Sequence, residues 1–114
     1  MEPISSNFAM RFGKLVRTVV PRRGKPYVQR CDLETFTAVA YLIDERAGRG
    51  LTTQEMWDGL PDAPCTQASV ALDFLKERGC VAVECRRCYP ASNFFYEDAL
   101  TEWHALAHHQ TTET

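Results

Sequence analysis

The chain has 114 residues, of which 45% are hydrophobic and 25% are charged, and its formal net charge is −2. This size and composition indicate one globular domain with a core that needs no disulfide or metal staple, and no apolar run is long enough to cross a membrane. The N-terminus lacks the basic region and apolar stretch of a secretory signal. We therefore expect a cytoplasmic protein whose five cysteines are reduced thiols.

Charge is divided unevenly along the chain. Residues 1–31 contain seven basic side chains and one acidic one, so this segment carries +6 and the remaining residues carry −8. A basic segment of this kind is typical of an arm that contacts nucleic acid or another polyanion. It is equally typical of a solvated, partly helical tail.

The first predicted element is an amphipathic helix within the basic segment. Its apolar residues recur at steps of four, three and four, as one stripe of a helix would: Phe8, Phe12, Leu15 and Val19. Pro21 ends the helix, and residues 22–26 are typical of a basic loop. We expect this helix to pack on the body or to pair two copies of the chain, since it is too short and too poor in aromatics for membrane binding.

Three helices are predicted next. Asp32 can cap the first, which has apolar residues at helical spacing. Thr52 and Glu55 have capping-box spacing at the start of the second, which is short. The third is expected over residues 65–78, followed by a glycine stop.

The composition then changes to that of a hairpin. Residues 80–85 have β-type composition, residues 86–93 are expected to form a loop, and residues 94–96 can return as the second strand. A last helix is predicted from the spacing of four apolar residues: Ala99, Leu100, Trp103 and Leu106. The residues after it, 109–114, are polar.

This order of elements resembles a winged helix-turn-helix. From Ala68 to Val81 the chain is similar to that superfamily's recognition helix running into its wing: a Ser-Val pair lies near the helix start, two leucines three residues apart anchor the helix, and an Arg-Gly pair turns the chain into the first wing strand. Residues 51–56 resemble the start of the superfamily's second helix. Residues 96–106 resemble its return strand and C-terminal helix, as in small bacterial transcription regulators.

The resemblance, which covers residues 33–106, implies an α+β, mainly α fold. A three-helix core carries a β-hairpin wing, with an extra N-terminal amphipathic helix and a C-terminal helix. The chain then divides into a basic N-terminal arm (residues 1–31), a winged helix domain (32–108) and a polar tail (109–114).

The docking mode of the superfamily places the start of the third helix in the major groove of double-stranded DNA. The resemblance and the basic segment together imply eight DNA-binding residues: Thr66, Gln67 and Ser69 in the helix, Arg86 and Arg87 near the wing tip, and Arg22, Arg23 and Lys25 in the basic loop. Glutamine can read adenine, and serine or threonine can contact bases or phosphates. We expect a transcription regulator that acts as a homodimer, because two-fold DNA sites favour two-fold proteins.

One feature departs from a typical DNA-binding helix. The predicted recognition helix has no Lys or Arg before Lys76, and it carries Asp73 and Glu77. Phosphate contacts supply much of the affinity for DNA, and they need cations. Either the basic arm and the wing supply those cations, or the domain is a winged helix module that binds a protein partner and not DNA.

Cysteine and histidine spacing raises a third alternative, a zinc-stabilised or zinc-finger-like domain. Four residues give C-x2-C-x15-H-x3-H, which fits a tetrahedral zinc site: Cys85, Cys88, His104 and His108. Against this hypothesis, Ser92 stands where a finger has an aromatic residue, the last helix is acidic, and a wing tip points away from that helix. We therefore favour no metal or other cofactor.

An enzyme is not predicted. The sequence contains no glycine-rich phosphate loop and no nucleophile elbow, and nothing singles out a Cys–His pair among its five cysteines. No catalytic residue is assigned.

Overall fold

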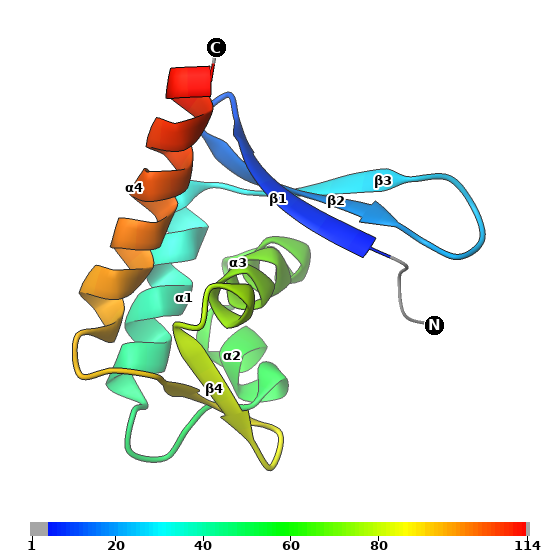
Figure 1. The fold of residues 1–114 in the computed structure, drawn as a ribbon. Coiled ribbons are helices and arrows are strands. Elements are labelled where there is room, and N and C mark those ends of the chain that lie inside the picture. Colours follow the sequence, from blue (N-terminus) through cyan, green and yellow to red (C-terminus); the bar gives the residue numbers. More distant parts are fainter. Residues whose placement is uncertain (1–4, 114) are drawn as a thin grey trace.

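Four helices and two antiparallel sheets make up the computed structural model, which describes residues 5–113, with side chains described for residues 7–108 (Figure 1). In chain order the elements are β1 (Ser5–Arg11), β2 (Lys14–Val20), β3 (Tyr27–Cys31), α1 (Leu33–Glu45), α2 (Thr53–Gly59), α3 (Cys65–Glu77), β4 (Val81–Glu84), β5 (Arg87–Pro90) and α4 (Phe95–Glu113). The sheet β1–β2–β3 lies across α3, while α1 and α4 run beside each other and the hairpin β4–β5 lies at the opposite end from the sheet. The fold is therefore a small α+β domain.

The predicted N-terminal amphipathic helix is wrong, because these residues form the three-stranded sheet with β2 at its centre. Four of the seven residues of β2 are β-branched: Val16, Thr18, Val19 and Val20. Such side chains lose rotamer freedom in a helix and fit a pleated surface. Gly13, with φ of +75°, turns β1 into β2 in the middle of the expected helix.

The apolar stripe that predicted this helix is divided between the sheet and its first turn. Phe8 faces α3, where its ring centroid lies 5.3 Å from that of Phe74. Leu15 and Val19 are buried on one face of β2, whereas Phe12 lies in the β1–β2 turn and is 99% exposed. Residues four apart lie on the same side of a helix and also on the same face of a strand, so the two steps of four fit both structures, and the step of three spans the β1–β2 turn.

The predicted starts of α1 and α2 are confirmed. The Asp32 carboxylate accepts a hydrogen bond of 2.8 Å from the Thr35 backbone N–H. Thr52 and Glu55 form both halves of the capping box, with hydrogen bonds of 3.1 and 3.0 Å. These side chains satisfy backbone donors that a helix N-terminus leaves free, which fixes where each helix begins.

The core lies between α1, α3, α4 and the inner face of the sheet. Phe74 of α3, which is fully buried, packs edge-on against Phe8 of β1 and against Phe36 of α1. The Phe36 ring in turn lies 4.8 Å from Trp103 of α4. Aromatic contacts therefore join the sheet to three helices, and this fixes the position of the sheet relative to α3.

The loop of the hairpin β4–β5 is shorter than the sequence predicted. Glu84 pairs with Arg87, so that only Cys85 and Arg86 form the turn. Both have positive φ, 51° and 67°, as a type I′ turn requires. Two backbone hydrogen bonds of 3.0 and 2.9 Å pair Leu51 with Cys88, which attaches the α1–α2 connection to the hairpin.

The predicted return strand at residues 94–96 is wrong, because β5 is complete by Pro90 and Phe95 begins α4. Phe95 is buried and continues the helical spacing of Ala99 and Trp103. The predicted C-terminal helix is confirmed, and it extends through Glu113 across residues expected to form a polar tail. Among residues 5–113 no helix is both long and apolar enough to cross a membrane.

Truncating two phenylalanines distinguishes the sheet from the helix that the spacing suggested. Phe8→Ala removes a ring packed on Phe74, so we expect a loss of about 2 kcal/mol in the free energy of unfolding. Phe12→Ala removes an exposed ring, and we expect a change within about 0.5 kcal/mol. Urea unfolding of both variants measures these values. Equal losses would mean that both rings are buried, as on one helical stripe.

Candidate nucleic-acid interface

Helix α3 exposes a strip of its surface between its contacts with β3 and with β4. The residues of this strip are exposed or half-buried: Cys65, Thr66, Ser69, Asp73, Lys76 and Glu77. Thr66 and Ser69, two of the predicted base-contacting residues, therefore lie on the same side of the helix. The strip holds one cation and two carboxylates, so α3 alone offers little attraction for phosphates.

Gln67 differs from Thr66 and Ser69, because it faces α1. Its side-chain Oε1 accepts a hydrogen bond of 3.0 Å from the Asp32 backbone N–H. The contact joins the start of α3 to the start of α1, across 35 residues of sequence. To read a base, Gln67 would have to give up this hydrogen bond and turn away from α1.

Arg17 of β2 contacts the exposed strip of α3 through an ion pair with Asp73. The Arg17 side chain is only 15% exposed, and its Nε also donates a hydrogen bond of 3.0 Å to the Gln29 side chain. The sheet therefore offsets one of the two negative charges on the strip. Tyr27, Lys76 and Glu77 line the groove beside this pair.

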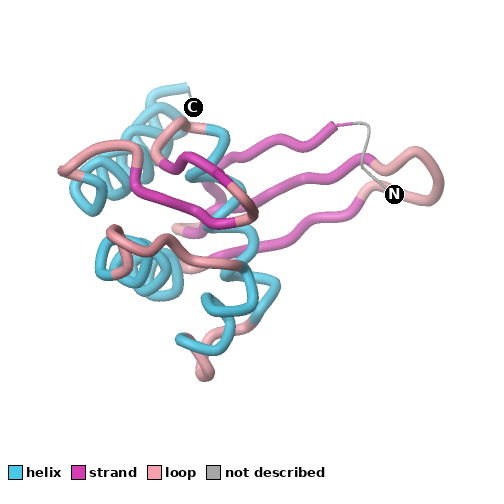
Figure 2. Tube along the Cα trace, turned by 90° about the horizontal axis from the view of Figure 1, so that it is seen from below, coloured by secondary structure: helices cyan, strands magenta, loops and turns pink. Residues whose placement is uncertain are grey.

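The loop between β2 and β3 projects past the helical body, as Figure 2 shows. It carries three of the predicted DNA-binding residues, Arg22, Arg23 and Lys25, which are all exposed. None of the three forms an ion pair within the described part of the chain. The strands on either side of the loop contain no acidic residue.

The outer face of the sheet is a second basic region. Phe8 and Arg17 face α3, so the residues that alternate with them along the strands face away from it. Three exposed cations lie on this outer face: Arg11, Lys14 and Arg30. Their charge is evident from the sequence, but their common surface is not, because the segment was predicted to be helical. Alternation within the strands is the signal that would have identified it.

At the hairpin tip, the two predicted arginines have different surroundings. Arg86 is exposed in the turn and makes no ion pair within residues 7–108. Arg87 instead donates a hydrogen bond of 3.0 Å to the Glu55 carboxylate, so it connects the hairpin to the capping box of α2. The Thr52 backbone N–H lowers the pKa of Glu55, and the charge of Arg87 lowers it further.

The four residues of the zinc hypothesis do not form a metal site. Cys85 is exposed in the hairpin turn and Cys88 is buried in β5, while His104 and His108 are exposed on α4. Within the described residues no three His, Cys, Asp or Glu side chains form a group that could hold a metal ion. Burial raises the pKa of the Cys88 thiol, which favours the protonated form over the thiolate that zinc binds.

The other buried cysteines have the same character. Burial, with a smaller contribution from Asp32, raises the pKa of Cys31 to about 12. Burial also raises the pKa of Cys80. A thiol held protonated at neutral pH is a poor nucleophile, so these cysteines have the properties of core residues.

Comparisons with protein-family models, with curated proteins and with solved structures find no match for this chain. Any function therefore has to be inferred from the chemistry and position of the residues described above.

The pH dependence of stability tests the contact between Glu55, its helix start and Arg87. A lowered pKa means that Glu55 stabilises the fold above its unfolded pKa and that this contribution is lost as the pH falls through the folded pKa. Glu55→Gln should therefore lower the urea midpoint near neutral pH, and the difference from wild type should shrink below about pH 4. Glu45→Gln, at an exposed position of α1, is the control. A difference that does not change with pH would contradict this role.

Proposed function

We propose that the chain is a DNA-binding winged helix protein in which the β2–β3 loop supplies the main contact with the phosphate backbone. The observation that carries this proposal is the position of Arg22, Arg23 and Lys25, which are exposed and make no ion pair with the described residues, on a loop that projects past the helices. Such cations attract phosphates and release bound counterions, which provides affinity for duplex DNA.

The winged helix assignment is supported by the arrangement after the sheet. Helices α1, α2 and α3 are followed by a hairpin with a two-residue turn, and the α1–α2 connection pairs with β5 through Leu51 and Cys88. In this assignment α3 is the recognition helix and the hairpin β4–β5 is the wing. The sheet β1–β2–β3 is an addition on the side of α3 that Phe74 faces.

The proposed docking places DNA against the exposed strip of α3, with the β2–β3 loop on one side and Arg86 of the wing on the other. Thr66 and Ser69 are then the proposed base contacts, since both are accessible from this side. Arg17 reduces the repulsion between DNA and Asp73. Regulation of transcription, by a homodimer on a two-fold site, belongs to the same proposal, although the residues expected to form a dimerisation helix are the strands β1 and β2.

A protein-binding winged helix is the second candidate. The features that favour it are two exposed aromatic side chains on the helical body, Tyr41 at 62% and Phe94 at 69% exposed. Large exposed aromatics are enriched in protein interfaces. This candidate requires no contact with phosphate, so the binding experiment below separates it from the first.

Two double variants, each removing two positive charges, test which surface binds DNA. Arg22→Gln/Arg23→Gln alters the loop, and Lys14→Gln/Arg30→Gln alters the outer face of the sheet. We expect the loop variant to weaken binding to a random duplex about tenfold at low salt and to reduce the slope of log affinity against log salt by about two, because two phosphate contacts are lost. The outer-face variant should lower the affinity less than about threefold.

Fluorescence anisotropy with a labelled duplex at several salt concentrations measures both quantities. A larger effect of the outer-face variant would mean that DNA lies on the side of the sheet away from α3, which contradicts the proposed docking. Undetectable binding of the wild-type chain at low salt would exclude DNA binding and leave the protein-binding module.

A further inference from the structure

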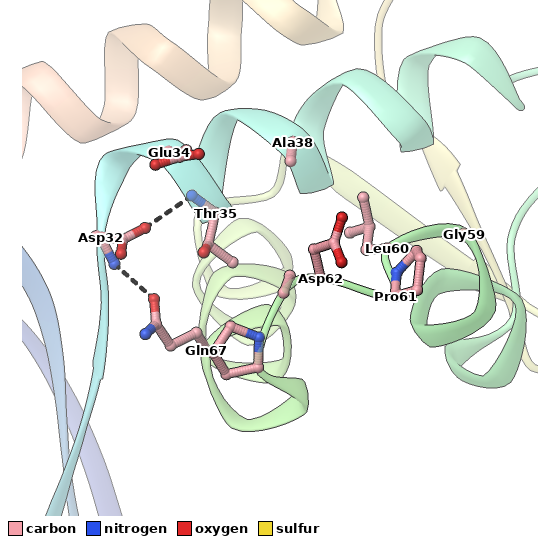
Figure 3. Close-up of a pocket in the computed structure, with 11 residues that line it drawn as sticks. Asp32, Glu34, Thr35, Ala38, Gly59, Leu60, Pro61, Asp62 and Gln67 are labelled. Atoms are coloured by element: carbon pink, nitrogen blue, oxygen red, sulfur yellow. Dashed lines mark hydrogen bonds between the residues drawn. The ribbon is translucent and has the colours of Figure 1, made fainter.

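A pocket of about 380 Å³ lies where α1, the α2–α3 turn and α3 meet (Figure 3). It is separate from the exposed strip of α3, since the only α3 residue in its wall is Gln67, which faces α1. The residues that give the pocket its chemistry come from all three segments: Asp32, Glu34, Thr35, Leu60, Asp62 and Gln67.

The wall of the pocket is acidic. Asp32, Glu34 and Asp62 contribute carboxylates, and the described residues that line the pocket include no Lys or Arg. One oxygen of Asp32 accepts the Thr35 backbone N–H, which leaves its second oxygen available. Asp62 makes no ion pair or side-chain hydrogen bond with the described residues. The pocket therefore favours a positively charged occupant.

Thr35 supplies an independent indication of a ligand. The residue is only 7% exposed, yet its hydroxyl has no hydrogen-bond partner among the described residues. Figure 3 shows the Thr35 side chain pointing from α1 into the space between Asp32, Gln67 and Asp62. The hydroxyl oxygen is open to the pocket, so an occupant there can hydrogen-bond to it.

Gln67 and the apolar part of the wall narrow the ligand class further. Gln67 uses its oxygen to accept the Asp32 N–H, which leaves its side-chain amide as a donor for an acceptor atom on the ligand. Leu60 and Pro64 provide apolar surface beside the carboxylates. No three His, Cys, Asp or Glu side chains among the described residues could jointly hold a metal ion, so a bare cation does not fit as well as an organic one.

We propose that this pocket binds a small organic cation, a protonated amine with an apolar group. The ammonium lies beside the second oxygen of Asp32 and donates to the Thr35 hydroxyl, Asp62 adds negative charge to the wall, and the apolar group packs on Leu60. The volume suits a ligand of this size. The inference is independent of DNA binding, because none of these interactions involves the exposed strip of α3 or the β2–β3 loop.

Titration of the isotope-labelled chain with benzylamine, followed by backbone amide NMR, tests the proposal. We expect saturable shifts centred on Thr35, Ala38, Asp62 and Gln67. Benzyl alcohol, which has a similar shape but no charge, should bind about tenfold more weakly. The absence of saturable shifts at these residues, or equal binding of the two probes, would overturn the proposal.

Two variants that each remove one negative charge then identify the residues that bind the amine. Asp62→Asn should weaken benzylamine binding about fivefold, whereas Asp44→Asn, an exposed position of α1 outside the pocket, should not change it. Thr35→Val removes the hydroxyl without changing the volume much and should also weaken binding. Asp62 is exposed, so the Asn variant keeps the test valid even if Thr35→Val fails to fold. Equal losses in the Asp62 and Asp44 variants would mean nonspecific attraction and would contradict a defined site.

Discussion

Contact of Phe74 with Phe8 and Phe36 is the interaction on which the arrangement of the molecule depends. Phe74 is fully buried, and its ring centroid lies 5.3 Å from Phe8 in the sheet and 6.0 Å from Phe36 in α1. A three-stranded sheet needs an apolar surface to pack against, and α3 provides that surface at this position. Because the sheet is held there, its β2–β3 loop projects past the helices, and Tyr27 at the end of the loop lines a groove with Lys76 and Glu77 of α3.

The same docking changes the electrostatics of α3. A helix with one lysine and two carboxylates on its exposed strip attracts phosphates poorly. Packing of the sheet brings Arg17 to Asp73, which offsets one of those carboxylates. It also adds three loop cations that make no ion pair with the described residues. The positive charge that the proposed recognition helix lacks is therefore supplied by the neighbouring sheet. The acidic pocket beside Gln67 lies apart from this basic surface.

Prediction from the sequence succeeded where the determining interactions are local. Asp32, Thr52 and Glu55 define helix starts through contacts within one helical turn, so spacing alone identified them. It failed for the N-terminal sheet, because a spacing of four fits both a helix and a strand, and the run of β-branched residues in β2 was the stronger signal. The basic loop residues could be predicted from composition. The ion pair of Arg17 and the hydrogen bond of Gln67 could not, because each joins residues distant in sequence.

The central claim is that the docked sheet places the β2–β3 loop and the exposed strip of α3 on one DNA-facing surface. Addition of a short duplex to the isotope-labelled chain, followed by backbone amide NMR, tests it most directly. We predict that the largest shifts occur at residues 22–25, at Thr66 and Ser69, and at Arg86, and that all of them titrate together with one affinity. Shifts confined to Lys14, Arg30 and their neighbours on the outer face, with Thr66 and Ser69 unaffected, would contradict the account.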